Sequence, residues 1–279
     1  MEEIYGIKYH KPKVILLQDT GIGVSETAAR TCYDSFYNSE NDVIQSLAST
    51  LPDEKQIESI NEIEDSSLLK DLAWTYFHHS ILEHANLSYL IRGTSRGVLQ
   101  EHARHRIQAI SVRSTRYTMS SIINAFVASN YGGGREFFID KVLGFDMFVI
   151  ADERYNKVEI SAMYDKLKYQ ESLVDDFNTL AVSKSSLGFL EQFGSDAQKL
   201  YEALEDGKKK RNVGDAFKHI ITDNVKVDMV VTFNLRSLKN YFTLRDSGAA
   251  YFQIRWLAQE MIKATPQKYL DLILKSTKE

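Results

Sequence analysis

The sequence predicts an α+β fold, in which a central sheet is flanked by helices within a single domain. First, 43% of the 279 residues are hydrophobic, which is enough to fill a sizeable core. Second, residues 86–92, NLSYLIR, alternate apolar and polar side chains as a half-buried strand does, whereas several other segments repeat apolar residues at helical spacing. Third, the chain has only three prolines and neither an internal repeat nor a low-complexity linker. We therefore expect residues 1–279 to form one continuous domain.

Charge and composition exclude several classes of protein. The chain carries 34 Lys and Arg against 38 Asp and Glu, so its net charge of −4 offers no global basic field for nucleic acid. Its single cysteine, Cys32, excludes an intramolecular disulfide framework and fits a reducing compartment. The N-terminal residues are acidic, and no window approaches the roughly eighteen apolar residues of a membrane span. We expect a cytoplasmic protein whose partners include neither nucleic acid nor a membrane.

The first half of the chain predicts two helices before the strand. Residues 25–33, SETAARTCY, begin with the Ser/Glu pattern of a helix start, and the acidic, polar segment 40–66 predicts a surface insertion. Residues 66–80, SSLLKDLAWTYFHHS, place six apolar side chains on one helical face: Leu68, Leu69, Leu72, Ala73, Tyr76 and Phe77.

After the strand, a further helix is predicted over residues 94–106, TSRGVLQEHARHR, with Thr94 or Ser95 as its N-cap and a loop beyond it.

The second half is mostly helical by pattern. Three consecutive glycines in NYGGGREFF predict a turn rather than a phosphate loop, because no Lys-Ser/Thr pair follows them. Residues 151–180 predict a long amphipathic helix, 205–214 a charged loop, and 131–210 as a whole a second insertion. In TFNLRSLKNYFTLR, Asn234 is the expected N-cap of a helix whose inward side chains are Leu235, Leu238, Tyr241 and Phe242.

The sharpest feature is a cluster of basic residues in EHARHRIQAISVRSTRY, residues 101–117. Arg104, Arg106, Arg113 and Arg116 lie there, with Arg96 a little upstream and only Glu101 nearby to balance them. The negative end of a helix dipole explains one or two such arginines, and arginine is suited to bidentate contacts with phosphate or carboxylate. We therefore favour an anion site over its alternative, a purely structural salt-bridge network. His105, between two arginines, is expected beside the ligand, where the positive charges disfavour its protonated form.

Other chemistries lack their signatures. His78, His79, Glu83 and His84 do not follow the HExxH order of helical zinc sites, so we expect no metal site. Neither a GxSxG elbow nor a GxGxxG dinucleotide fingerprint occurs, which argues against a serine hydrolase and a simple Rossmann fold.

Three blocks carry a resemblance to a known family. Arg104-His105-Arg106, seven further residues, Ser114 and then Arg116-Tyr117 resemble the RHR-x7-S signature of flavin-dependent thymidylate synthases, with its trailing x-R-Y. Upstream, SILEHANLSYLIRGTSRGVLQEHARHR is similar to the E-H, strand, helix and RHR succession of that family. Downstream, NLRSLKNYFTLR resembles its N-x-R-S-L-x-N-F-x-x-L-R block, and AARTCYDSF gives weaker support. Together these blocks cover roughly a third of the chain, and residues 131–210 have no secure match.

The resemblance implies a reaction and its ligands. Members of the family methylate dUMP to dTMP, with methylenetetrahydrofolate as one-carbon donor and NADPH as reductant through bound FAD. All of these ligands are anionic, which matches the predicted anion site. The resemblance also implies a mostly antiparallel sheet and a homotetramer whose active sites are shared between subunits.

Residue by residue, the resemblance implies the following roles. FAD is expected at Ser80, Arg104, His105, Arg106, Asn234, Arg236 and Asn240. The nucleotide is expected at Glu101, Arg104, Val112, Arg113, Ser114, Thr115, Arg116, Lys218 and Arg245. Arg245 is the implied catalytic residue, because it matches the arginine that promotes ionisation of uracil N3 and a fixed cation stabilises the developing anion. Ser114 has no activating base, so we assign it to holding dUMP rather than to attacking it.

Two positions depart from the commonest family pattern. Ser111-Val112 stands where many members have Asn-Glu, so a carboxylate near the substrate is missing and Val112 offers only its backbone. Ala249 stands where a flavin-contacting histidine is common. Two alternatives therefore stay open: a non-catalytic nucleotide- or RNA-binding protein that uses the same arginines, and an inactive flavoprotein descendant.

Overall fold

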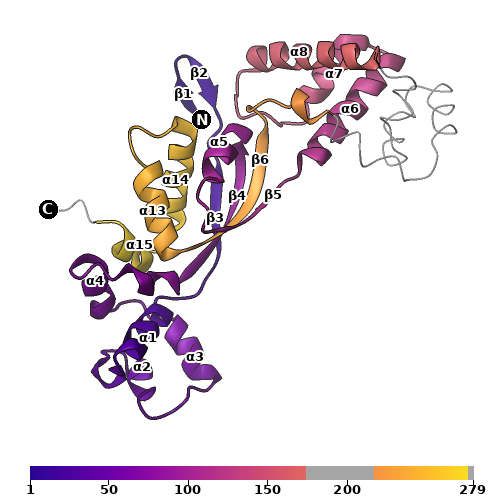
Figure 1. Cartoon of the computed structure of the whole chain (residues 1–279). Helices are drawn as coiled ribbons and strands as arrows, with labels where there is room; N and C mark the ends of the chain where they lie inside the picture. Colours follow the sequence, from indigo (N-terminus) through magenta and orange to yellow (C-terminus); the bar gives the residue numbers. More distant parts are fainter. Residues whose placement is uncertain (174–216, 276–279) are drawn as a thin grey trace. The chain divides into compact units, whose positions relative to one another are not determined.

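The computed structural model describes residues 1–173 and 217–275, and the chain divides into two compact units (Figure 1). The helical unit comprises Met1–His10, Ser95–Gly97 and Arg113–Lys226, and the sheet unit comprises Lys11–Thr94, Val98–Val112 and Val227–Glu279. Within the described ranges, no helix combines the length and the apolar character that a membrane span requires.

The sheet unit is built on a four-stranded sheet with the order β3-β4-β6-β5. Its strands are β3 (Lys13–Asp19), β4 (Asn86–Ser95), β5 (Ala109–Val112) and β6 (Lys226–Asn234). β3 pairs antiparallel with β4, and β5 pairs antiparallel with β6. The predicted α+β class, with a mostly antiparallel sheet flanked by helices, is therefore confirmed.

Alternation along β4 explains why this strand lies at the centre of the sheet. Leu87, Tyr89 and Ile91 are fully buried in the core, together with Val231 and Phe233 of the neighbouring strand β6. The residues between them point to the other face, as the period of a strand requires. The strand predicted over residues 86–92 is thus confirmed, and it continues to Ser95.

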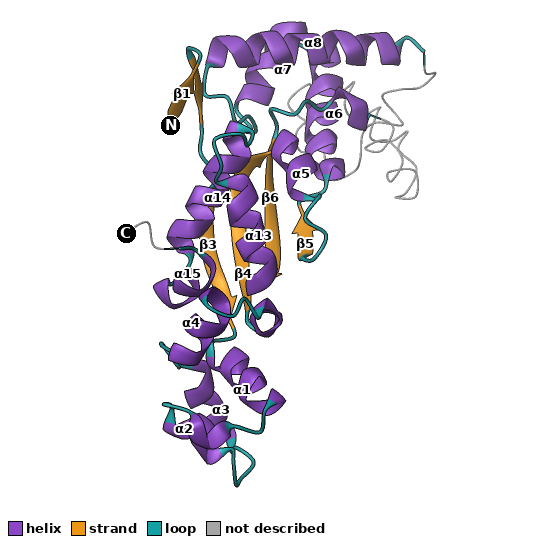
Figure 2. Cartoon of the chain, turned by 60° about the vertical axis from the view of Figure 1, so that its left-hand side comes forward, coloured by secondary structure: helices purple, strands orange, loops and turns teal. Residues whose placement is uncertain are grey.

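Helices α13 (Leu235–Arg245) and α14 (Phe252–Ala264) lie over one face of this sheet (Figures 1 and 2). The Asn234 side chain accepts a hydrogen bond from the Ser237 backbone N–H at 2.8 Å, so the predicted N-cap is confirmed. The predicted inward side chains are all buried: Leu235, Leu238, Tyr241 and Phe242. The cap and the apolar stripe together fix where α13 begins and which of its faces remains free.

Shorter helices complete the sheet unit. They are α1 (Gly23–Cys32), α2 (Asp42–Ser46), α3 (Glu54–Asn61), α4 (Ser67–Trp74) and α15 (Gln267–Ile273), with 3-10 turns η1 (Phe36–Asn38) and η2 (His79–Glu83). The predicted helix over residues 25–33 is confirmed, and it begins two residues earlier. Segment 40–66 contributes Ile44 and Ile60 to the buried core. At Gly23 a Cβ atom would lie 2.1 Å from the Ile60 carbonyl oxygen, so this close packing requires glycine.

The apolar stripe predicted for residues 66–80 is too long. Leu69 and Ala73 are fully buried, but α4 ends at Trp74, and Tyr76 and Phe77 are 62% and 60% exposed. Phe77 has φ = +55°, a left-handed conformation that cannot continue a helix. The chain therefore turns here, and the two aromatic side chains leave the core.

The helix predicted over residues 94–106 is also shorter than expected. Thr94 and Ser95 belong to β4, and α5 spans only Arg96–His102. The loop expected beyond it contains strand β5, which pairs with β6 at Ala109↔Thr232 through Val112↔Met229. Pairing with a strand distant in sequence, rather than local propensity, forms β5.

The helical unit has its own core. It contains the hairpin β1 (Glu2–Ile4) and β2 (Ile7–Tyr9), the helices α6 (Thr115–Tyr131), α7 (Gly134–Leu143) and α8 (Glu153–Glu171), and the turn η6 (Lys218–Ile220). Phe126, Phe138 and Tyr164 pack together in that core. The glycine turn is confirmed between α6 and α7, with Gly133 at φ = +75°.

The long helix predicted over residues 151–180 is confirmed as α8 as far as Glu171. The end of that prediction and the charged loop over 205–214 lie outside the described residues.

Candidate active site

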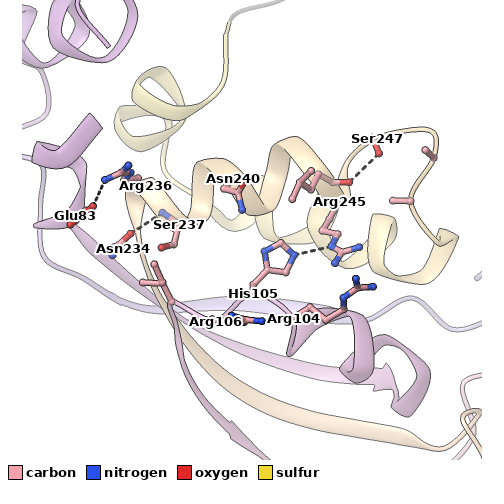
Figure 3. A pocket seen from close by; sticks show the side chains of 14 residues that line it. Glu83, Arg104, His105, Arg106, Asn234, Arg236, Ser237, Asn240, Arg245 and Ser247 are labelled. Carbon is pink, nitrogen blue, oxygen red and sulfur yellow. Dashed lines mark hydrogen bonds and ion pairs between the residues drawn. The ribbon is translucent and has the colours of Figure 1, made fainter. Parts of the chain in front are cut away.

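A cavity of about 1000 Å³ lies in the sheet unit, between the loop that follows α5 and one face of α13 (Figure 3). Seven residues predicted from the sequence line it: Arg104, His105, Arg106, Asn234, Arg236, Asn240 and Arg245. These side chains come from two segments that are far apart in the sequence, and the fold brings them together. Their roles toward ligands stay predictions.

The free face of α13 is the wall of the cavity. Because Leu238, Tyr241 and Phe242 face the core, residues Arg236 and Asn240, one turn apart, are left to point into the cavity. The N-terminal end of a helix carries a partial positive charge, which attracts phosphate groups. This wall therefore suits an anionic ligand.

Arg245, in the last turn of α13, is held by Glu101 of α5 and by His105, which lies three residues after the end of α5. Its Nη1 donates to Glu101 Oε2 at 2.5 Å, and its Nη2 donates to the Glu101 main-chain carbonyl at 3.1 Å. Its Nε donates to His105 Nε2 at 2.8 Å, a contact visible in Figure 3. All three guanidinium nitrogens thus donate to the protein. Glu101 itself is absent from the lining of the cavity, and its side chain is 34% exposed.

The surroundings of His105 disfavour its protonated form. Burial contributes most, Arg245 and Arg104 act in the same direction, and Glu101 acts against them, so that the pKa of His105 is lowered to about 4. The geometry agrees, because Nε2 accepts a hydrogen bond from an arginine that cannot lose its proton. The expectation that positive neighbours disfavour the protonated form is therefore confirmed.

Behind His105 lies a buried pair that the sequence analysis did not single out. Tyr241 packs edge-on against the His105 ring, with centroids 4.7 Å apart, and its hydroxyl lies 3.1 Å from His102 Nδ1. Both residues are fully buried, and burial lowers the pKa of His102 to about 4. Tyr241 lies one helical turn before Arg245, so both side chains project from the same side of α13, and both contact His105.

Three further arginines of the cavity differ in their pairing. Arg236 Nη1 donates to Glu83 Oε1 at 2.5 Å, whereas Arg104 and Arg106 form no ion pair with any residue in 1–173 or 217–275. The cavity therefore holds more positive than negative charge. Glu83 was considered only as a metal ligand from the sequence, although its E-H block was part of the resemblance.

A second cavity, of about 540 Å³, adjoins the first at Arg236, which lines both. Ser80, expected at the flavin, lines this second cavity, together with the exposed Cys32 and the exposed Phe77. Cys32 is the last residue of α1, and its side chain is exposed.

The remaining predicted residues lie elsewhere. Val112, in β5, packs against the core of the sheet unit. Arg113, Ser114, Thr115, Arg116 and Lys218 belong to the helical unit. There Ser114 is the N-cap of α6, and its Oγ accepts from the Arg116 backbone N–H at 3.3 Å. Their contact with a nucleotide stays a prediction.

Several lining residues were not predicted. They are Ile107, Ser237, Leu244, Ser247 and Ala250. Ala249, predicted as a departure from the family pattern, lines the cavity as well. The signal for Ser237 and Leu244 was present, since helical spacing places them beside Arg236 and Asn240 on the free face.

Comparison with known proteins gives a consistent result. Residues 16–269 match the model of a family described as thymidylate synthase complementing protein. The chain is 27% identical over 257 residues to a flavin-dependent thymidylate synthase from Campylobacter jejuni (strain RM1221), covering 92% of this chain and 93% of that protein. It is 28% identical over 256 residues to a flavin-dependent thymidylate synthase from Wolinella succinogenes, covering 92% and 94%.

Solved structures give the same fold. The crystal structure of thymidylate synthase X from Helicobacter pylori, with FAD and dUMP, aligns with a TM-score of 0.59. The two chains are 23% identical, and the alignment covers 96% of this chain and all of that one. At this identity the likeness is one of fold.

Proposed function

The chain belongs to the thymidylate synthase complementing protein family, and from that premise we propose that it is an FAD-dependent thymidylate synthase. It methylates dUMP to dTMP, with methylenetetrahydrofolate as the one-carbon donor and NADPH as the reductant. The observation that carries the proposal is the meeting of Arg104, His105 and Arg106 with Asn234, Arg236, Asn240 and Arg245 in one cavity. These are the two blocks of sequence that resemble the family.

The residues present fit FAD. A dinucleotide is elongated and carries a pyrophosphate, and here two adjoining cavities meet at Arg236 beside the N-terminal end of α13. Arg104 and Arg106 add two guanidinium groups without ion-pair partners among residues 1–173 and 217–275. We assign FAD to both cavities, held by these arginines, by Asn234 and Asn240, and by Ser80 at the far end. When bound, FAD supplies the hydride chemistry that the side chains of this protein lack.

Arg245 is the proposed catalytic residue. A guanidinium held in place by Glu101 and His105 cannot reorient during the reaction, so it is ready to stabilise negative charge that develops on uracil N3. The nucleotide is assigned to Arg104, Val112 and Arg245 of the sheet unit, with Glu101 as the partner of Arg245, and to Arg113, Ser114, Thr115, Arg116 and Lys218 of the helical unit. The family resemblance supports these assignments.

The protein is proposed to act in the cytoplasm as a homotetramer with shared active sites. Ile107, at the edge of the cavity, is 70% exposed, and Leu244 is 51% exposed, so the cavity has an apolar rim that a partner subunit would cover.

Tritium release from 5-tritiated dUMP tests the proposed function. Purified protein is supplied with FAD, methylenetetrahydrofolate and NADPH, and release is measured together with dTMP. We expect both, with each dependent on the folate and on NADPH. Protein that binds FAD and yields neither product would be an inactive flavoprotein, and colourless protein that binds nucleotide without FAD would be a binding protein.

A further inference from the structure

Glu101 stands in an unusual position for a substrate-binding residue. It is absent from the lining of the cavity, yet both its carboxylate and its main-chain carbonyl accept hydrogen bonds from Arg245. Its contact with the cavity thus runs through Arg245. The observed contacts of Glu101 are thus with Arg245, whereas the family resemblance implies a direct contact with the nucleotide.

The hydrogen bonds from Arg245 to Glu101 and His105 use some of its N–H donors and leave others free. A guanidinium has five N–H groups, and three of them donate to Glu101 and His105. One N–H on each terminal nitrogen is then left for a ligand. Since Nε donates to His105 Nε2, that nitrogen is an acceptor, and the proton of the neutral imidazole is on Nδ1.

We propose that Glu101 is a positioning residue, which holds Arg245 so that its Nε–H fixes the His105 proton on Nδ1. Glu101 and His105 are four residues apart in the sequence, and Arg245 lies between them, with Nη1 and Nη2 donating to Glu101 and Nε donating to His105. The pKa of His105, lowered to about 4, is consistent with the neutral form. This inference rests on the proposed function, because it gives His105 and Arg245 a fixed set of donors toward the ligands of that reaction.

The proposal predicts that turnover and dUMP affinity respond differently to Glu101→Ala. The charge of Arg245 remains in this variant and loses its counter-charge, so attraction of the anionic nucleotide is retained. The guanidinium loses its carboxylate anchor and keeps the Glu101 main-chain carbonyl and His105, so its orientation and that of His105 are less firmly fixed. We expect kcat to fall at least about tenfold while the Kd of dUMP stays within about threefold of wild type.

A spectroscopic measurement tests the proton position directly. In FAD-loaded protein labelled with ¹⁵N-histidine, the His105 signals are identified by their loss in His105→Asn. We expect wild type to show a protonated Nδ1 and an unprotonated Nε2 at neutral pH. Glu101→Ala should show averaging of the two tautomers, whereas Glu101→Gln, which keeps an acceptor oxygen, should retain the wild-type signals. Glu260→Ala, which removes a surface ion pair with Lys263 on α14, is the matched control and should match wild type throughout.

Several outcomes would overturn the proposal. If the His105 proton of the wild type is on Nε2, the proposal is wrong, and this result needs no variant that folds. Equal losses of turnover and dUMP affinity in Glu101→Ala would make Glu101 a direct substrate contact. The proposal is also wrong if Glu101→Ala changes turnover without changing the His105 signals, or the signals without changing turnover. If the wild type binds FAD and dUMP but makes no dTMP, the proposed function fails, while calorimetry and NMR still decide the role of Glu101.

Discussion

Arg245 shows why the type of cation matters at this site. Its planar fork reaches Glu101 in two directions and His105 in a third, with hydrogen bonds of 2.5 to 3.1 Å. A lysine ammonium is a point charge and cannot span these partners at once. The residue therefore organises the wall of the cavity and also presents positive charge to a ligand.

Arg245→Lys should reduce turnover more than dUMP affinity. The charge that attracts the nucleotide remains, but the oriented donors that stabilise the transition state are lost, and only interactions stronger in the transition state raise the rate. We expect a loss of turnover on the order of 10- to 100-fold, corresponding to roughly 1.5–3 kcal/mol for a charged hydrogen bond. Steady-state kinetics and calorimetric titration measure the two effects.

Arg255→Lys is the matched control, because Arg255 lies on α14 and is 3.8 Å from Asp246 in an exposed ion pair. Turnover close to wild type in Arg245→Lys, with clearly reduced thermal stability, would make Arg245 a purely structural residue.

Arg116→Ala should weaken dUMP binding much more than FAD binding. The assignment rests on the trailing x-R-Y of the family signature, which places Arg116 at the nucleotide. Loss of a charged hydrogen bond to phosphate costs on the order of 1.5–3 kcal/mol. Calorimetric titration of both ligands measures the difference, and Arg154→Ala, at a side chain 93% exposed in the same unit, serves as the control. Equal losses for dUMP and FAD would mean that Arg116 is misassigned.

The two buried histidines predict how stability depends on pH. The pKa values of His102 and His105 are both lowered to about 4, mainly by burial, whereas an unfolded chain binds these protons near pH 6.5. The unfolded state therefore binds more protons between pH 6.5 and 4, so stability falls as pH falls through this window and the effect levels off below it.

Urea denaturation at pH 7, 6 and 5 measures this dependence. The groups that face the pair are Arg245 and Tyr241 on α13 and Glu101 and Arg104 beside it. His102→Gln removes one of the two histidines, so its stability should change less steeply with pH than that of wild type. The same slope in both proteins would contradict the assignment.

At the scale of elements, the sequence predicted those helices and strands whose ends are set by residues close together in the chain. Helix α13 could be predicted because its cap, Asn234, and its apolar stripe lie within one short segment. The end of α4 could not, because it depends on a left-handed turn at Phe77 that no local pattern requires. The same holds for β5, which exists through its pairing with β6.

In the candidate site, too, the motif residues could be predicted from the sequence, whereas contacts between distant segments could not. The motif residues Arg104 to Arg106 and Asn234 to Arg245 could be predicted to act together, because both blocks resemble one family. The hydrogen bonds of Arg245 to Glu101 and His105 could not, since they depend on how α5 and α13 pack. The pairing of Arg236 with Glu83 likewise joins residues distant in sequence.

Substitutions of Asn234 distinguish its role as the N-cap of α13 from its proposed role in FAD binding. Asn234→Ala removes the acceptor for the Ser237 N–H and should cost about 1 kcal/mol of the free energy of unfolding. Asn234→Asp keeps an acceptor and favours the helix dipole, so stability should be retained, but its negative charge in the cavity should weaken FAD binding. Urea denaturation and FAD titration of both variants measure this. Loss of stability in Asn234→Asp equal to that in Asn234→Ala would refute the capping role.

At the scale of the whole molecule, the sheet unit has one face packed and one face with accessible apolar side chains. Ile15 pairs opposite Leu90 and Val230 opposite Ser111, each between neighbours that point into the core. Ile15 is 54% exposed and Val230 is 37% exposed. Apolar groups on a sheet face are stabilised when another surface covers them, which is consistent with the proposed homotetramer.

Val230→Glu should therefore dissociate the assembly. If the sheet face is buried between subunits, a carboxylate at its centre is placed in an apolar interface, where an unpaired charge is strongly unfavourable. In an isolated chain the same change is on an accessible strand position and should alter the free energy of unfolding by less than about 1 kcal/mol. Size-exclusion chromatography with light scattering measures the mass, and Leu51→Glu, at a side chain 95% exposed, is the matched control. We expect a tetramer for wild type and Leu51→Glu and a smaller species for Val230→Glu. A tetrameric Val230→Glu would place the subunit interface elsewhere, and a monomeric wild type would refute the assembly itself.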